Sequence, residues 1–157
     1  MDDETFARVS REGMTMLYRI SMSILHHAPD AEDAVQQGLL RAWEHRDRGR
    51  PGCERAWITR IVINECRNIQ RHRMRVVPME TLAEPEWTPP DTRLRDAMAS
   101  LPEKYRLPVL LKYMEGMTER EAAAALGMTT AGLKSRLLRA RRALATALRE
   151  EVTFHED

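Results

Sequence analysis

The chain has 157 residues, of which 43% are hydrophobic and 31% are charged, a composition that suits one ordinary globular domain or two small ones. Charged residues interrupt every apolar run, and the acidic N-terminus lacks the apolar core of a secretion signal, so we expect neither membrane insertion nor export. Two cysteines, Cys53 and Cys66, cannot build a disulfide framework, so we expect reduced thiols and a cytoplasmic protein. Few aromatic residues and many Ala, Leu and Arg residues favour an all-α fold.

The net charge is only +1, from 25 Lys and Arg residues against 24 Asp and Glu residues, and it gives no overall indication of a nucleic-acid partner. The charges are nevertheless segregated along the chain. Residues 55–75 hold six arginines and one glutamate, and residues 134–149 hold six basic residues and no acid. Residues 76–92 contain four acids and no base, and residues 150–157 are acidic again. The neutral total therefore hides two basic blocks.

Residues 76–92 also hold half of the eight prolines of the chain. Paired prolines and scarce apolar periodicity predict an extended linker there rather than a helix. We therefore expect two small helical domains, residues 1–75 and 93–157, joined by a Pro-rich acidic linker.

The first half predicts three helices, because apolar residues recur in it at three- and four-residue steps. They are expected over residues 3–26, from about residue 30 onward, and over residues 54–73. Trp43 and Trp57 are expected to anchor the core, and Cys66 to be a small core residue. Gly38 is expected to weaken the second helix by about 1 kcal/mol relative to Ala.

The second half is also predicted to be helical. Residues 91–100 lead to Leu101-Pro102, where proline suits the first turn of a helix that runs from residue 103 to about 115. Pro108 inside this helix predicts a kink or a shifted start. Gly116 is expected to end it.

The following residues fit a helix-turn-helix. Thr118 and Glu121 have the spacing of a capping box at the start of a short helix, and Gly127 suits the left-handed residue at its end. Thr129 then caps a long helix that reaches about residue 149. One side of this helix is apolar and its N-terminal part could enter a major groove. The alternative is an ordinary amphipathic helix with solvated charges.

A second polar stripe lies on the predicted helix over residues 54–73. Arg60, Asn64, Arg67 and Arg71 recur at steps of four, three and four residues, with Asn68 beside them. Arginine binds phosphate and asparagine can pair with base edges, so the stripe suits a nucleic acid. A solvated helix face is the alternative. The polar residues of the helix before it form a possible protein-docking surface, and a solvent face explains them equally well.

Signals of catalysis are absent from the sequence. It contains no Gly-rich phosphate loop, no serine elbow and no HExxH pattern. His26-His27 and the two cysteines lack metal-ligand spacing. We therefore expect no enzyme activity, no metal and no cofactor.

Several segments resemble one family. In the first half they are Asp30-Ala-Glu-Asp-Ala-Val-Gln36 and Arg55-Ala-Trp57-Ile58-Thr-Arg60-Ile61 through Asn64; in the second half they are Leu101-Pro102-Glu103-Lys104-Tyr105-Arg106, Glu115-Gly116-Met117-Thr118, Glu121-Ala-Ala, Leu126-Gly127-Met128 and Leu133-Lys134-Ser135-Arg136-Leu137 through Arg139-Ala140-Arg141. Together they resemble a bacterial RNA polymerase sigma factor of the extracytoplasmic-function (ECF) group of the sigma-70 family. The resemblance spans about residues 5–148 and implies a three-helix region 2-like domain and a four-helix region 4-like domain.

The resemblance implies a role for each polar surface. Contacts with the polymerase core are implied for Asp33, Gln36, Gln37 and Arg41. Contacts with the opened minus-ten element are implied for Arg55, Arg60, Asn64, Arg67, Asn68 and Arg71. Contacts with the minus-thirty-five duplex are implied for Arg120, Thr130, Lys134, Ser135, Leu138 and Arg139. Gln37 and Leu138 depart from the residues that the family usually has at these positions.

The implied partners are core RNA polymerase, through its β′ clamp helices and β flap, promoter DNA, and a separate anti-sigma factor. The free protein is expected to be a monomer. The main hypothesis is an alternative sigma factor that directs core polymerase to promoters and helps to open the DNA. Two alternatives stay open: a stand-alone helix-turn-helix transcription regulator, and a sigma-like module that sequesters a protein partner.

Overall fold

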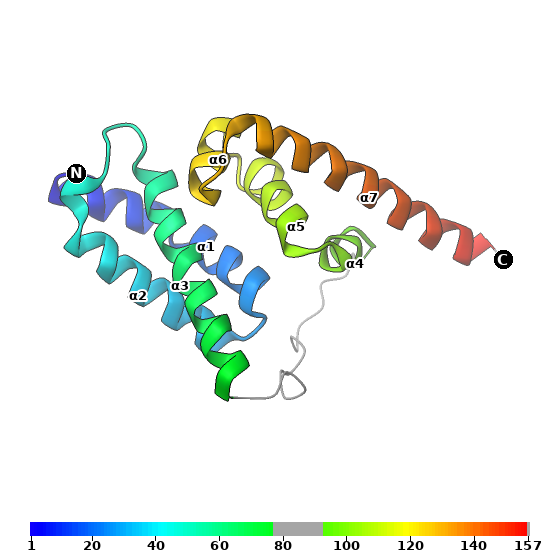
Figure 1. The fold of residues 1–157 in the computed structure, drawn as a ribbon, viewed down its shortest axis with the longest axis horizontal. Coiled ribbons are helices and arrows are strands. Elements are labelled where there is room, and N and C mark those ends of the chain that lie inside the picture. The colour runs from blue at the N-terminus through cyan, green and yellow to red at the C-terminus, as the bar shows by residue number, and fades with distance from the viewer. Residues whose placement is uncertain (77–92, 157) are drawn as a thin grey trace. The chain divides into compact units, whose positions relative to one another are not determined.

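The computed structural model describes residues 1–76 and 93–156, and within this part of the chain the fold is all-α, as predicted, with no strand (Figure 1). The elements are α1 (Asp3–Leu25), α2 (Ala28–Glu44), the short 3₁₀ turn η1 (Arg46–Arg48), α3 (Glu54–Val76), α4 (Arg93–Ser100), α5 (Glu103–Val109), the π-helical turn η3 (Leu110–Met114), α6 (Glu119–Leu126) and α7 (Thr130–Glu156). The predicted linker lies almost wholly outside the described residues, and so does Trp87.

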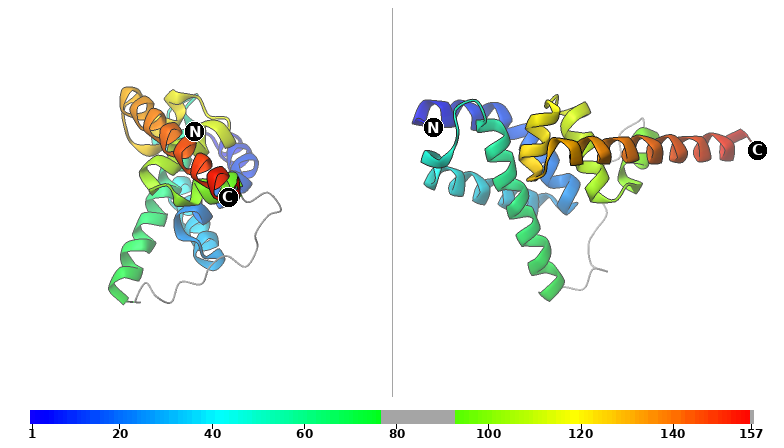
Figure 2. Two further views of the ribbon diagram at one scale, coloured as in Figure 1. Left: turned by 90° about the vertical axis from the view of Figure 1, so that its right-hand side faces the viewer. Right: turned by 45° about the horizontal axis from the view of Figure 1, so that its top comes forward.

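The helices form two compact units, each with its own core. The first unit contains α1, α2 and α3, and the second contains α4, α5, η3, most of α6, and α7. Figure 2 shows the two groups of helices from two further sides. No helix in the described part of the chain is long and apolar enough to cross a membrane.

Three mutually packed helices make up the first unit. Asp2 caps α1 by accepting a hydrogen bond of 2.7 Å from the Thr5 backbone N–H. His26 ends the same helix in the left-handed conformation with a φ of 52°. The completely buried side chains of the unit include Ile20, Val62 and Cys66, so the prediction that Cys66 is a core residue is confirmed.

Gly38 has a packing role that the sequence analysis did not foresee. It is buried where α2 meets α3, and a Cβ atom on it would lie 2.6 Å from Val62 Cγ2 and 3.0 Å from Val62 Cα. Such distances are not tolerated between carbon atoms. The absence of a side chain therefore allows the two helices to approach closely, and this packing offsets the helix propensity that glycine lacks.

The prediction that Trp43 anchors the core is wrong. Its side chain is 38% exposed, and its ring meets the edge of Phe6 at a centroid distance of 5.3 Å. The guanidinium of Arg46 lies 3.8 Å from the centre of the Trp43 ring, a cation–π contact. Trp43 therefore packs at the surface of the first unit, against Phe6 and Arg46. Trp57 is half-buried.

Helix α6, the turn at Gly127 and the start of α7 form the predicted helix-turn-helix. Glu121 N–H donates to Thr118 Oγ1 at 3.0 Å, and Thr118 N–H donates to a Glu121 carboxylate oxygen at 3.3 Å, which confirms the capping box. Gly127 has a φ of 67°, as expected for the end of α6. Thr129 then caps α7 by accepting a hydrogen bond of 3.1 Å from the Gly132 N–H.

Pro108 affects its helix as the sequence suggests. Proline cannot donate a backbone hydrogen bond, and α5 changes after Val109 into the wider π-helical turn η3. Gly116 follows with a φ of 69° and confirms the predicted end. Helix α7 continues seven residues past the expected end at residue 149, and its C-terminal part extends beyond the rest of its unit (Figures 1 and 2).

Candidate nucleic-acid interface

The predicted polar stripe runs along the solvent-facing side of α3. Arg60, Asn64, Asn68 and Arg71 are exposed, and Arg55 and Arg67 are half-buried. Arg71 donates a hydrogen bond to the Asn68 side-chain oxygen, so these two residues form one polar unit. On the opposite side of the helix, Ile58, Val62 and Ile63 are buried. The structure thus brings the six predicted residues onto one helix while its apolar face holds it in place.

One arginine of the basic block has a structural role instead. Arg73 Nε donates to Asp30 Oδ2 at 2.7 Å, and Arg73 Nη1 donates to the Leu25 carbonyl at 2.9 Å. Gln70 supports the same end of α3 by donating to the Ile24 carbonyl at 3.2 Å. These bonds join α3 to the last turn of α1 and the first turn of α2. The charge that is available to a partner is therefore smaller than the charge counted along the sequence.

The predicted docking residues of α2 fall into two groups. Asp33, Gln36 and Gln37 are exposed, whereas Arg41 pairs with Glu65 of α3. The distance from Arg41 Nε to Glu65 Oε1 is 2.6 Å, and the Glu65 side chain is only 10% exposed. The importance of Glu65 was not predicted from the sequence. The feature that could have indicated it is that Glu65 is the single acidic residue among the six arginines of residues 55–75.

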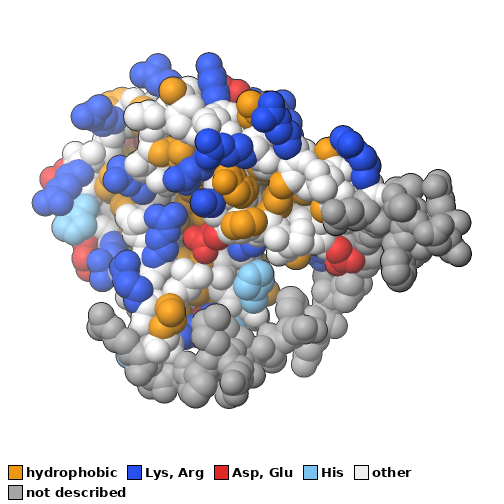
Figure 3. Space-filling view, turned by 45° about the vertical axis from the view of Figure 1, so that its right-hand side comes forward, with side chains coloured by type: hydrophobic (Ala, Val, Ile, Leu, Met, Phe, Trp, Pro, Cys, Tyr) orange, Lys and Arg blue, Asp and Glu red, His pale blue; other side chains and the backbone are white. Residues whose placement is uncertain are grey.

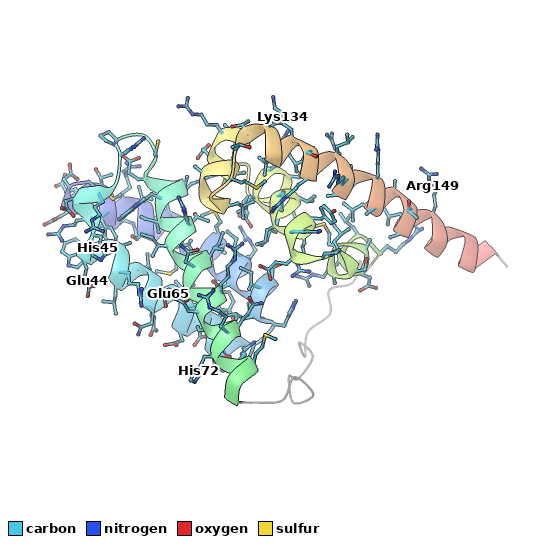
Figure 4. All side chains as sticks on the ribbon, in the orientation of Figure 1. Glu44, His45, Glu65, His72, Lys134 and Arg149 are labelled. Carbon is cyan, nitrogen blue, oxygen red and sulfur yellow. The ribbon has the colours of Figure 1, made fainter. Side chains whose placement is uncertain are left out.

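The pair with the nearly buried Glu65 gives Arg41 two roles. A carboxylate in a nearly buried position requires a charged partner, because an unpaired buried charge is strongly destabilising. Arg41 supplies that partner and joins α2 to α3, while its side chain remains 60% exposed. Figure 4 shows Glu65 near the middle of α3.

Helix α7 separates its apolar and polar residues as predicted. Leu133, Leu137 and Ala140 are buried against the other helices of the second unit. The residues expected at the minus-thirty-five element are all exposed, namely Thr130, Lys134, Ser135, Leu138 and Arg139, with Arg120 on α6. Leu138 is 45% exposed although the leucine directly before it is buried. Lys134 lies in the first part of α7, beside α6 (Figure 4).

Two of these basic residues have partners on neighbouring helices. Lys134 Nζ lies 3.7 Å from Glu119 Oε2, and Lys112 Nζ lies 2.5 Å from Glu119 Oε1. The hydrogen bond from Lys112 and the two positive charges hold the pKa of Glu119 below its usual value. A hydrogen bond from Arg139 likewise lowers the pKa of Tyr105 on α5. Lys and Arg side chains are prominent on the face drawn in Figure 3, with apolar side chains between them.

Among the described residues, no group of three or more His, Cys, Asp or Glu side chains is placed to hold a metal ion. Cys53 is exposed and Cys66 is buried, and neither forms a disulfide bond.

Family models match both units. Sigma-70 region 2 matches residues 11–76, and sigma-70 region 4 matches residues 91–144. The chain is 33% identical over 154 residues to the ECF RNA polymerase sigma factor SigL of Mycobacterium tuberculosis, in a match that covers 88% of this chain and 86% of SigL. The chain belongs to the ECF sigma factors. This sigma factor is also 34% identical over 164 residues to the RNA polymerase sigma-E factor of Streptomyces antibioticus, with 94% and 84% of the two chains covered.

Solved structures show the same relationship. The sigma factor RpoE of Bartonella quintana, crystallised in complex with the anti-sigma factor NepR, matches with a TM-score of 0.73 and 26% identity, over 93% of this chain and 95% of RpoE. CnrH, in complex with the cytosolic domain of CnrY, matches with a TM-score of 0.70 and 25% identity, over 95% and 90% of the two chains. The main functional hypothesis from the sequence is confirmed: this is a sigma factor that binds RNA polymerase and directs it to promoters.

Proposed function

We propose that the two units of this sigma factor divide promoter recognition between them: α3 binds the opened minus-ten element, and the first part of α7 binds the minus-thirty-five duplex. The observation that carries this proposal is the different chemistry of the two exposed faces. Amide side chains alternate with arginines on α3, whereas α7 exposes lysine, serine, leucine and arginine directly after a capped helix start.

The surface of α3 suits single-stranded DNA. The exposed amides Asn64 and Asn68 can pair with the base edges that melting uncovers, and Arg60 and Arg71 can follow the phosphate backbone. Arg55 and Arg67 are half-buried on the same helix, and both would contact a strand that lies along it. A base held out of the stack would meet the same residues.

The first part of α7 suits duplex DNA. A helix that begins directly after a turn can insert its first residues into a major groove. Thr130, Lys134, Ser135 and Arg139 would contact phosphates and base edges, with Arg120 near a phosphate. Leu138 would make an apolar contact, for which the methyl group of thymine is the partner that the groove offers.

Core binding is assigned to α2 on the first unit. Asp33, Gln36 and Gln37 provide an exposed polar face for the β′ clamp helices, and Arg41 borders it while bound to Glu65. The second unit would contact the β flap. In this proposal the domains are residues 1–75 and 93–157, and the acidic linker 76–92 runs through the polymerase toward its active-site cleft.

The remaining features follow from this role. The protein is a cytoplasmic monomer when it is free, catalyses no reaction itself, and lends promoter specificity to the polymerase. An anti-sigma factor controls it, and the complex of its structural relative RpoE with the anti-sigma factor NepR supports that assignment.

The test is reconstitution with core polymerase on a library of promoter sequences, in which salt-resistant open complexes are counted and sequenced. We expect co-elution with core and selection of two separated DNA elements. Tight binding of duplex DNA by the free protein without co-elution with core would favour a stand-alone regulator. Co-elution without any open complex would favour a sequestering module.

A further inference from the structure

The second unit contains a charge cluster at the start of α6. Glu119 is the first residue of this helix, and the capping box of Thr118 and Glu121 fixes the backbone around it. Its carboxylate lies between two lysines from other elements, Lys112 on η3 and Lys134 on α7. Lys134 is a proposed contact of the minus-thirty-five duplex. An acid that pairs with a DNA-binding lysine competes with phosphate for the same ammonium group.

The two ion pairs are unequal. The distance from Lys112 Nζ to Glu119 Oε1 is 2.5 Å, and this lysine side chain is 27% exposed. The distance from Lys134 Nζ to Glu119 Oε2 is 3.7 Å, beyond hydrogen-bonding range, and this side chain is 64% exposed. Lys112 is therefore the firmly bound partner, and Lys134 can leave without breaking a hydrogen bond.

We propose that Glu119 is an internal counterion that positions Lys134: its carboxylate holds the Lys134 ammonium group in the free protein and releases it to a DNA phosphate. This inference rests on the proposed role of α7. A lysine that binds a phosphate releases a counterion from the DNA, and this release drives association. When the lysine must first leave a carboxylate, part of the free energy gained from counterion release is lost. The second unit therefore binds duplex DNA less tightly than it would without Glu119.

Lys112 makes this exchange possible. Once Lys134 has moved to the DNA, Glu119 would otherwise be left as an uncompensated negative charge close to the phosphate backbone. The hydrogen bond with Lys112 keeps the carboxylate neutralised. The hydrogen bond from Lys112 and the charges of the two lysines lower the pKa of Glu119.

The test is a double-mutant cycle with Glu119→Gln and Lys134→Met in the full chain. It measures the affinity of reconstituted holoenzyme, at several salt concentrations, for the upstream duplex selected in the promoter library. In the presence of Lys134, we expect Glu119→Gln to raise affinity by about two- to fivefold, as for release from a surface ion pair. The salt slope should steepen by up to about 0.9. In the Lys134→Met background the same change should have little effect.

Asp96→Asn is the matched control, because it removes an exposed carboxylate from α4 of the same unit. It should change affinity equally with and without Lys134. Lys112→Met provides a second variant: we expect it to lower affinity only while Glu119 is present.

Two outcomes would overturn the inference. An equal gain from Glu119→Gln in both backgrounds would mean that only net charge matters, and a loss of affinity would mean that Glu119 supports DNA binding. Both differ from a failure of the proposed function, in which holoenzyme containing the unaltered chain would select no upstream element at all.

Discussion

Helices α3 and α7 are both basic and amphipathic, but their arginines and lysines are used differently. On α3, Arg73 anchors the end of the helix to Asp30 and the Leu25 carbonyl, and the exposed positions combine arginine with asparagine. On α7, exposed basic residues extend from Lys134, near the capped start of the helix, to Arg149, and those near the start are separated by serine and leucine. The number of positive charges is thus a poor guide to function, and the side chains between them are more informative.

The two helices also differ in how they are supported. The close contact of Gly38 with Val62 fixes α3 against α2, and the pair of Arg41 and Glu65 reinforces it. Among the residues of α7 whose burial is described, 130–149, only Leu133, Leu137 and Ala140 are buried. A rigid α3 suits a surface that must hold unstacked bases in place, whereas a helix exposed along one side suits insertion into a groove.

The largest effect is expected for Gly38→Ala, which tests the support of α3. Its new Cβ atom would clash with Val62, and overpacking of this kind costs about 1–3 kcal/mol of unfolding free energy. Thermal unfolding followed by circular dichroism measures it. The control is Gly13→Ala on α1, where a Cβ atom would lie 3.7 Å from Met16 Cε, an ordinary contact. This control should stabilise the protein by up to about 1 kcal/mol, because only the helix propensity changes. Equal stabilisation by both changes would refute the close approach.

Next in size is Lys134→Ala combined with Arg139→Ala, which tests the duplex role of α7. We expect holoenzyme affinity for the upstream element to fall about tenfold, and its salt slope to flatten by about 0.9 for each lost phosphate contact. Binding at a series of salt concentrations measures both quantities. Arg149→Ala is the control, because Arg149 is exposed on the same helix but far from its start (Figure 4). If promoter choice and salt slope stay unchanged in the double variant, the assignment of these contacts is wrong.

Asn64→Ala tests the role of α3 and should have a smaller effect. We expect about five- to tenfold fewer open complexes, the size of effect expected for one amide–base contact, with unchanged co-elution with core polymerase. The two readouts separate the alternatives, since an equal loss of both would indicate that Asn64 supports folding instead.

The smallest effect concerns the cap of α1. The hydrogen bond from the Thr5 backbone N–H lowers the pKa of Asp2 from its usual 3.8. A lowered carboxyl pKa adds stability above the unfolded-state pKa, and that stability is lost as the pH falls through the folded-state pKa. Asp2→Asn keeps the hydrogen-bond acceptor but removes the charge. We expect it to lower the melting temperature slightly at neutral pH, with the difference disappearing as the pH falls through the lowered folded-state pKa. A difference that persists in acid would exclude this origin.

Much of the fold could be predicted from the sequence, because its signals are local. Apolar residues at three- and four-residue steps mark the helices, and Thr118, Glu121, Gly127 and Thr129 mark the helix-turn-helix through bonds to their near neighbours. The same periodicity placed the predicted stripe residues on one face of α3.

Other features depend on contacts between residues that are distant in the chain. The need for glycine at position 38 comes from Val62 on another helix, and the role of Arg73 comes from Asp30, 43 residues earlier. Trp43 was expected in the core because large aromatic residues usually are, but Phe6 and Arg46 hold it at the surface. Periodicity within one helix cannot reveal which partner another helix presents.

The division of labour between α3 and α7 can be measured directly by attaching a DNA-cleaving iron chelate to single cysteines. Cys53→Ser removes the exposed thiol, and Cys66 can stay because it is completely buried. His72→Cys places the probe on α3, and Ala131→Cys places it at the start of α7, both at exposed positions outside the proposed contacts. In open complexes, the probe on α3 should cleave at the minus-ten element and the probe on α7 at the minus-thirty-five element. Cleavage by both probes at one element would contradict the account.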